Sequence, residues 1–245
     1  MPLQPPCAVL PIPIAIPKIT SATRPSTFSY YGPVQSSLVS EAAQFLASTT
    51  DADELEVTST IASFIQATQN DCIGEAEEKA ACWLTIRITK PNGAFKVPRW
   101  HQDGRMFSCD SGREDEVRSK YALSLLGPRT LMLHPDAQVF STYQRREKEH
   151  YWWHGIPGTA PTAEDIEKAD SSLRHWLAAE FKDTSRVRLG DGEVVRFSWG
   201  REDSPVHSEP DFVCDRVFVS VLYGSEPELR RMCEWRSVEY EKYDW

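Results

Sequence analysis

The 245-residue sequence lacks most of the features that mark membrane, secreted or disulfide-bonded proteins. No apolar run is long enough to cross a bilayer, and the stretch from Ala8 to Pro17 is interrupted by prolines and follows no cationic segment. The six cysteines form no C-x-x-C motif and no regular spacing, which favours reduced thiols over a disulfide framework or a zinc site. We therefore expect a cytoplasmic globular protein that does not bind membranes.

Basic residues are scarce relative to acidic ones. The chain has 27 Lys and Arg against 36 Asp and Glu, which gives a net charge of −9. The densest basic group, at residues 145–148, is diluted by Glu147. Because proteins that bind nucleic acids use a basic face to neutralise phosphates, the sequence favours a small-molecule substrate and no nucleic-acid partner.

Histidine is also rare, with six in the chain, but two of them suggest a metal site. His101 and Asp103 form a His-x-Asp pair, and His207 follows about a hundred residues later. Two imidazoles and one carboxylate occupy one face of a metal and leave its other positions open, as in mononuclear non-haem iron sites. A second His-x-Asp pair, His134 and Asp136, competes for the same role.

The segment around the distal histidine has a clear β pattern. Gly190-Asp191-Gly192 separates two runs rich in β-branched residues, 186–189 and 193–199, which indicates a hairpin. His207 comes next, and Arg216 then opens an apolar run that ends near Tyr223. A guanidinium beside an iron site is suited to holding a carboxylate through two hydrogen bonds.

This order resembles the C-terminal half of the double-stranded β-helix in Fe(II)/2-oxoglutarate-dependent oxygenases, and the resemblance covers roughly residues 81–223. It implies a mainly β, α+β fold with a jelly-roll, cupin-like core, and the use of Fe(II), 2-oxoglutarate and O₂. It also implies oxidation of a substrate C–H bond with release of succinate and CO₂. In such a site Arg216 would hold the far carboxylate of the co-substrate, with a hydroxyl from Ser220 or Tyr121. Family members often have Arg-x-Ser, whereas Ser220 stands four residues beyond Arg216.

The topology of this family favours the first His-x-Asp pair as ligands. Residues 121–133 resemble the hairpin that follows the His-x-Asp strand in this family. If His101 and Asp103 bind the metal with His207, this hairpin follows them and strands remain to complete the barrel. Pro135 also favours a turn, which makes His134 a surface residue. Of the arginines near the distal histidine, we prefer Arg216 to Arg196 and Arg201, because a buried charge at the start of an apolar strand needs a partner.

The remaining segments predict one oxygenase domain at 37–245 after a Pro/Ser/Thr-rich arm at 1–36. The arm is expected to be extended and irregular, and two helices are expected within 37–70. An insertion at about 144–185 interrupts the core. Residues 224–245 form a C-terminal segment after the core. The insertion contains a helix beginning near Ala163 and two adjacent tryptophans, Trp152 and Trp153, which could form a lid over the substrate or dock the insertion on the core. His150 and His154 are expected to be surface residues.

Three alternatives remain open. A cupin-type metal enzyme that does not use 2-oxoglutarate would share the fold and the metal ligands. A protein side-chain hydroxylase would share the chemistry but act on a macromolecule. A non-catalytic scaffold using the Pro-rich arm would need no metal.

Overall fold

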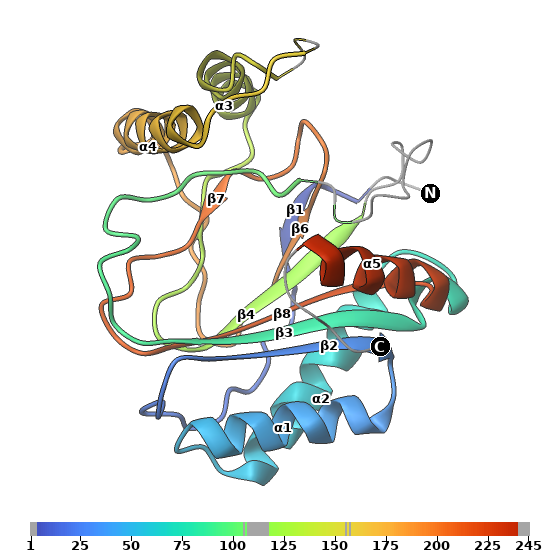
Figure 1. Cartoon of the computed structure of the whole chain (residues 1–245). Coiled ribbons are helices and arrows are strands. Elements are labelled where there is room, and N and C mark those ends of the chain that lie inside the picture. Colours follow the sequence, from blue (N-terminus) through green and yellow to red (C-terminus); the bar gives the residue numbers. More distant parts are fainter. Residues whose placement is uncertain (1–3, 105, 107–117, 155, 157, 240–245) are drawn as a thin grey trace.

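A six-stranded antiparallel sheet forms the centre of the protein (Figure 1). The computed structural model describes residues 4–104, 106, 118–154, 156 and 158–239. Along the sheet the strand order is β1-β6-β4-β8-β3-β2. The bounds of these strands are Cys7–Val9 (β1), Ser26–Pro33 (β2), Ala81–Thr89 (β3), Ser119–Leu126 (β4), Val195–Ser198 (β6) and Arg216–Gly224 (β8). The protein is thus of mixed α+β class, as the sequence predicts.

A second, much shorter sheet lies apart from the first (Figure 1). It pairs β5 (Leu131–Met132) with β7 (His207–Ser208). Isolated bridges extend it on both sides, joining His101 to His207 and Leu133 to Arg186. This small sheet matters because it carries both histidines of the predicted metal site.

Alternation along the central strands gives the large sheet two different faces. In β8 the odd-numbered residues from Val217 to Tyr223 belong to a large apolar core. The even-numbered Arg216, Phe218 and Ser220 line a cavity on the opposite face. Because successive side chains of a strand point to opposite faces, a single strand serves both the core and the cavity.

Two helices cover the apolar face of the sheet (Figure 1). They are α1 (Ser36–Thr49) and α2 (Glu54–Asp71), within the range where the sequence predicts two helices. The Asp53 side chain caps α2 by accepting hydrogen bonds from two backbone N–H groups of its first turn. The helices thus bury the core and leave the opposite face of the sheet for polar groups.

The Pro-rich arm differs from the irregular segment that its composition suggests. It supplies both edge strands of the large sheet, since β1 pairs with β6 and β2 pairs with β3. Between these strands, Leu10, Ile14 and Ile19 are buried in the main core. Proline is tolerated in short edge strands and in the segments between them. The Pro-rich composition of the arm therefore does not reveal its two strands.

Three further helices complete the described part of the chain (Figure 1). Helix α3 (Ala137–His150) begins before the predicted insertion, whereas α4 (Ala163–Glu180) lies within it and starts with a reciprocal capping box between Thr162 and Asp165. Helix α5 (Glu226–Glu239) packs through Leu229 and Met232 against Trp83 of β3. A short 3₁₀ helix, η1 (Glu77–Lys79), precedes β3. None of the described helices combines the length and hydropathy that a bilayer span needs.

The buried arm gives a prediction about stability. Replacing Ile14, which is 8% exposed, by Ala should lower the free energy of unfolding by about 2–4 kcal/mol, because the substitution leaves a cavity in the core. The same change at Ile12, which is 74% exposed, should alter it by less than about 0.5 kcal/mol. Urea unfolding followed by circular dichroism measures both. Equal small effects would mean that the arm does not fold onto the sheet.

Candidate metal centre

The two histidines of the site are held together by their own backbones. The N–H of His101 donates to the carbonyl of His207, and the N–H of His207 donates to the carbonyl of His101, each at 2.9 Å. Residues directly opposite each other in an antiparallel pair present their side chains on the same face. Asp103 lies two residues beyond His101 and so returns to the side of the imidazole.

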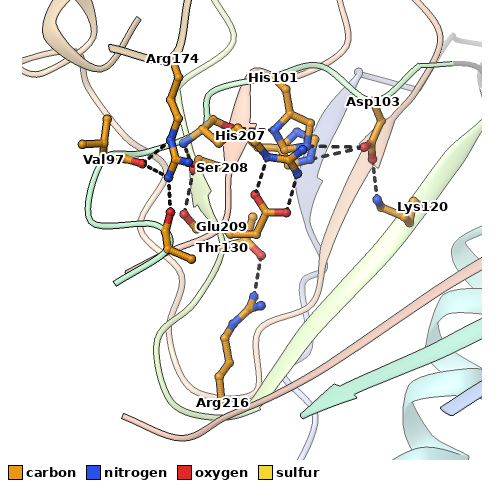
Figure 2. A network of polar contacts seen from close by, with 12 residues as sticks. Val97, His101, Asp103, Lys120, Thr130, Arg174, His207, Ser208, Glu209 and Arg216 are labelled. Atoms are coloured by element: carbon orange, nitrogen blue, oxygen red, sulfur yellow. Dashed lines mark hydrogen bonds and ion pairs between the residues drawn. The ribbon is translucent and has the colours of Figure 1, made fainter. Parts of the chain in front are cut away.

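The three side chains converge on one point (Figure 2). Their ligand atoms all lie within 4.8 Å of one another. Oδ1 of Asp103 is 3.8 Å from Nε2 of His101 and 3.7 Å from Nε2 of His207. Three donors at these separations can bind one metal ion after small adjustments.

Backbone carbonyls select the tautomer of each imidazole. Nδ1 of His101 lies 2.8 Å from the carbonyl oxygen of Arg99, and Nδ1 of His207 lies 3.1 Å from that of Pro205. A carbonyl oxygen only accepts hydrogen bonds, so each Nδ1 carries the proton and donates it. The lone pair of each neutral ring is then on Nε2, the atom that faces Asp103.

Burial favours neutral imidazoles. Desolvation lowers the pKa of His207 to about 4, although the Asp103 charge opposes the shift. Desolvation likewise lowers the pKa of His101. Both rings are therefore available as metal ligands at neutral pH.

Lys120 of β4 holds the other oxygen of Asp103. Its Nζ lies 2.5 Å from Oδ2, and the two side chains are only 18% and 11% exposed (Figure 2). Burial by itself would raise the pKa of Asp103, but the charge of Lys120, joined by the histidines once they are protonated at low pH, outweighs burial and places that pKa below its ordinary value. Asp103 is therefore ionised, with Oδ1 left to face the histidines.

The aromatic ring of Phe197 connects these groups. Its centroid lies 4.8 Å from that of His207, and Nζ of Lys120 lies 4.9 Å from the same ring. Phe197 is 1% exposed. The ring thus fixes the position of one ligand and of the lysine that holds another.

A cavity of about 380 Å³ opens beside the site, between the large and the small sheet. His101, Asp103 and His207 line it from one side, and residues of β3 and β8 line it from the other. Its walls also include several aromatic and apolar side chains: Trp83, Phe95, Met106, Phe197, Phe212 and Phe218. The open side of the three ligands therefore faces a partly apolar chamber.

Arg216 lines the same cavity and forms no ion pair within the described part of the chain. It is 4% exposed, and among the described residues no carboxylate lies within 4.0 Å of it. Its Nε donates to the carbonyl of Pro128 at 2.8 Å. Nη2 donates to Oγ1 of Thr130 at 3.2 Å (Figure 2). Desolvation lowers its pKa to about 10, which leaves it charged at neutral pH. Three of its five N–H bonds remain for a ligand.

Gly127 allows the chain to approach Arg216 so closely. Its φ of +77° lies in the left-handed region, and a Cβ atom there would lie 2.2 Å from the carbonyl oxygen of Asp215. Only glycine fits this turn without strain. The turn places the Pro128 carbonyl and the Thr130 hydroxyl beside the guanidinium.

The other residues predicted to bind the co-substrate have different positions. Ser220 lines the cavity, roughly 13 Å along the strand from Arg216. Tyr121 does not line it, since its ring is buried in the helix-covered core and its hydroxyl donates to Asp71. Strand alternation presents the neighbouring Lys120 instead, which the sequence reasoning missed. Tyr121 and its neighbour Ala122 both suit a buried face. The sequence therefore does not show which alternate residues of β4 face the cavity.

The competing arginines and the second His-x-Asp pair also lie elsewhere. Arg196 forms an ion pair with Asp71 on the helix side of the sheet, and Arg201 forms one with Asp203. Asp136 caps α3 by accepting a hydrogen bond from the N–H of Gln138, next to the exposed His134. Each of these groups already has a structural role.

The two tryptophans of the insertion do not line the cavity. They lie in the turn after α3, where Trp152 is 59% exposed. Trp153 is buried and packs edge-on against Tyr151. A lid formed by this pair is therefore not part of the described structure, and the ring contacts of Trp153 are with its chain neighbours Tyr151, Trp152 and His154. His150 is partly buried and its Nδ1 donates to the Arg146 carbonyl, whereas His154 is exposed.

Comparisons with known proteins give only distant likenesses. Neither a family model nor a curated protein sequence matches the chain. A prolyl-4-hydroxylase of Pseudomonas putida is similar in structure with 13% identity and a TM-score of 0.34, over 81% of this chain and 84% of that one. A viral collagen prolyl hydroxylase from Paramecium Bursaria Chlorella virus-1 shares 11% identity at the same TM-score, over 81% and 89%. The function proposed below rests instead on the residues of this chain.

The ion pair of Asp103 gives a prediction about the metal-free protein. Lys120→Met should lower the free energy of unfolding by about 2–4 kcal/mol, because it leaves a buried carboxylate without its partner. Mn(II) should recover part of this loss by neutralising the same carboxylate. In an Asp103→Asn background the lysine substitution should have a much smaller effect. Urea unfolding of the four proteins measures the coupling, and equal losses in both backgrounds would contradict it.

The low pKa of His207 predicts a pH dependence of stability. The pKa is about 4 in the folded protein against an ordinary 6.5, so the unfolded chain takes up the proton first as the pH falls. This contribution is complete above about pH 6.5 and is lost progressively down to about pH 4. Between pH 7 and 4 the metal-free wild type should lose on the order of 3 kcal/mol more than His207→Gln. Parallel pH profiles from urea unfolding would show that the histidine is not buried in its neutral form.

Proposed function

We propose that the protein is a non-haem Fe(II)/2-oxoglutarate-dependent oxygenase that oxidises a C–H bond of a small organic substrate. One observation carries the proposal. A three-ligand site with an open side faces the same cavity as a buried arginine that no carboxylate of the described residues pairs with. Such an arrangement suits an acid with two binding groups, one of which binds the open side of the metal while the other, a carboxylate, binds the arginine.

The ligand set supports iron. His101 and His207 would bind through Nε2, and Asp103 would bind through Oδ1, which leaves the cavity side of the metal open. Two imidazoles and one carboxylate on one face are the usual ligands of Fe(II) in oxygenases. Iron bound there supplies the activation of O₂ that couples decarboxylation of 2-oxoglutarate to oxidation of the substrate.

Arg216 suits the far carboxylate of 2-oxoglutarate. Its guanidinium is fixed by Pro128 and Thr130, so a carboxylate would meet a donor that is already oriented. An anion would also offset the desolvation that lowers its pKa. Ser220, farther along the same face of β8, would contact the co-substrate or the substrate rather than share the Arg216 carboxylate.

The rest of the architecture is consistent with this proposal. The two sheets on either side of the cavity would be the halves of a double-stranded β-helix, in a single domain at 37–245 to which the arm adds edge strands. A cavity of about 380 Å³ is within the range of small-molecule sites and suits a small substrate better than a nucleic acid.

Anaerobic titration of the Fe(II)-loaded protein with 2-oxoglutarate tests the proposal through the visible metal-to-ligand charge-transfer band. The band should appear in the wild type and be absent in His101→Ala. Arg216→Gln should weaken 2-oxoglutarate binding by about 10–100-fold, because one charge-assisted interaction is lost. Arg201→Gln, which changes an arginine outside the cavity, should leave the affinity unchanged within about twofold.

Each negative result has a separate meaning. Iron binding without the band would remove 2-oxoglutarate and favour a cupin-type metal enzyme. A protein that binds no iron would contradict the metal site itself.

A further inference from the structure

The charged groups of the cavity are strongly unbalanced. Among the described residues that line it, five side chains are basic and two are carboxylates. The basic residues are Arg87, Arg99, Lys120, Arg216 and Arg236, and the acids are Asp103 and Glu209. This excess of positive charge is unusual for a protein with a net charge of −9.

Both carboxylates are already paired with two of these cations. Lys120 holds Asp103, and Arg99 donates to Glu209 at 2.7 Å. Arg236 stacks over the Trp83 ring at 4.3 Å and makes further interactions, so its charge is not counted in the balance. Arg87 and Arg216 then remain as the two cavity arginines without a carboxylate within 4.0 Å among the described residues.

Arg87 and Arg216 lie near each other but at different depths. In the pairing of β3 with β8, Arg87 is opposite Phe218 and Arg216 is opposite Thr89, so the two arginines are diagonal neighbours. Desolvation is the main cause of the lowered pKa of Arg216; the Glu209 charge opposes this shift and the Arg87 charge adds to it. Arg216 is buried, whereas Arg87 is exposed, and both line the cavity. The cavity therefore has an inner, buried cation and an outer cation that solvent reaches.

One dianion does not neutralise this arrangement. Without Arg236, four cations and two carboxylates leave two positive charges, and Fe(II) adds two more. 2-Oxoglutarate brings two negative charges, one at the metal and one at Arg216, so two positive charges remain. Like charges at this spacing repel more strongly in a partly buried cavity than in water. A second anion at Arg87 would relieve that repulsion.

An aromatic ring lies between the two arginines. Phe218 is directly opposite Arg87 in the strand pairing, and its ring packs against the Arg216 guanidinium at 4.2 Å. Phe95 and Phe212 line the same cavity and pack edge-on with centroids 5.1 Å apart. A guanidinium beside aromatic walls suits a carboxylate attached to an apolar body. A single arginine matches the two oxygens and single charge of a carboxylate better than the two charges of a phosphate.

We propose that the primary substrate is a carboxylic acid with an apolar body, and that Arg87, the outer cation, binds its carboxylate. The inference rests on the proposed oxygenase function, because that function assigns Arg216 to the co-substrate. Arg87 thereby selects an acid and orients its apolar part toward the metal ligands.

A matched pair of probes tests this site without knowledge of the natural substrate. 3-Phenylpropanoate and 3-phenylpropanamide differ in charge but hardly in shape. Their binding to the Mn(II)-loaded protein is measured by ligand-observed NMR, with and without 2-oxoglutarate. The acid should bind in the millimolar range, and the amide should bind about tenfold more weakly or not at all.

Variants then locate the binding to Arg87. Arg87→Gln should weaken the acid about tenfold and change the affinity for 2-oxoglutarate by less than about twofold, whereas Arg87→Lys should retain part of the acid binding. Arg129→Gln, a control at an arginine paired with Asp191 outside the cavity, should affect neither ligand. Arg87 is exposed, so these changes should leave the fold intact.

The outcomes separate this inference from the proposed function. An acid that binds no better than its amide, or equally well to Arg87→Gln, overturns the carboxylate site. An Arg87→Gln variant that loses 2-oxoglutarate as strongly as Arg216→Gln assigns both arginines to the co-substrate and also overturns it. Loss of the iron charge-transfer band in the wild type contradicts the oxygenase alone, because the acid and amide are compared without 2-oxoglutarate as well.

Discussion

The reciprocal backbone hydrogen bonds between His101 and His207 are the interaction on which the candidate site depends. They join two segments that are 106 positions apart and place both imidazoles on one side of the small sheet. With the backbones paired in this way, Asp103 needs only strand alternation to reach the same point. The bonds to the Arg99 and Pro205 carbonyls then turn each Nε2 toward it. The backbone thus assembles the three ligand atoms before any metal is bound.

Strand alternation also gives the two faces of the large sheet different roles: one face forms the apolar core and the other lines the cavity. The valines and Tyr223 of β8 pack under α1 and α2, while Arg216 and Ser220 of the same strand reach the cavity. The apolar face and its helices can therefore offset the unfavourable burial of Arg216 and of the Lys120–Asp103 pair. A one-residue shift in register would exchange the two faces and lose both functions.

The sequence predicts the parts of this site that short patterns encode. His101 and Asp103 share a motif, and the distal His207 precedes a recognisable strand, so these three side chains meet as expected. Tyr121 and Lys120 show the limit, because the apolar pattern of β4 does not reveal which alternate residues face the cavity. The edge strands within the arm depend on long-range pairing, which local patterns do not contain. Arg87 could not be recognised either, since an arginine in a strand most often faces solvent.

The Lys120–Asp103 contact links the geometry of the site to its proposed chemistry. A free aspartate can bind a metal through both oxygens, and a second oxygen would occupy a position that an acid and O₂ require. Lys120 already holds Oδ2 in a largely buried pair, so only Oδ1 faces the histidines. The lysine thereby favours a ligand set of three atoms and keeps the cavity side of the metal open. Its charge also adds to the positive excess of the cavity, so the group that restricts the carboxylate also favours anionic ligands.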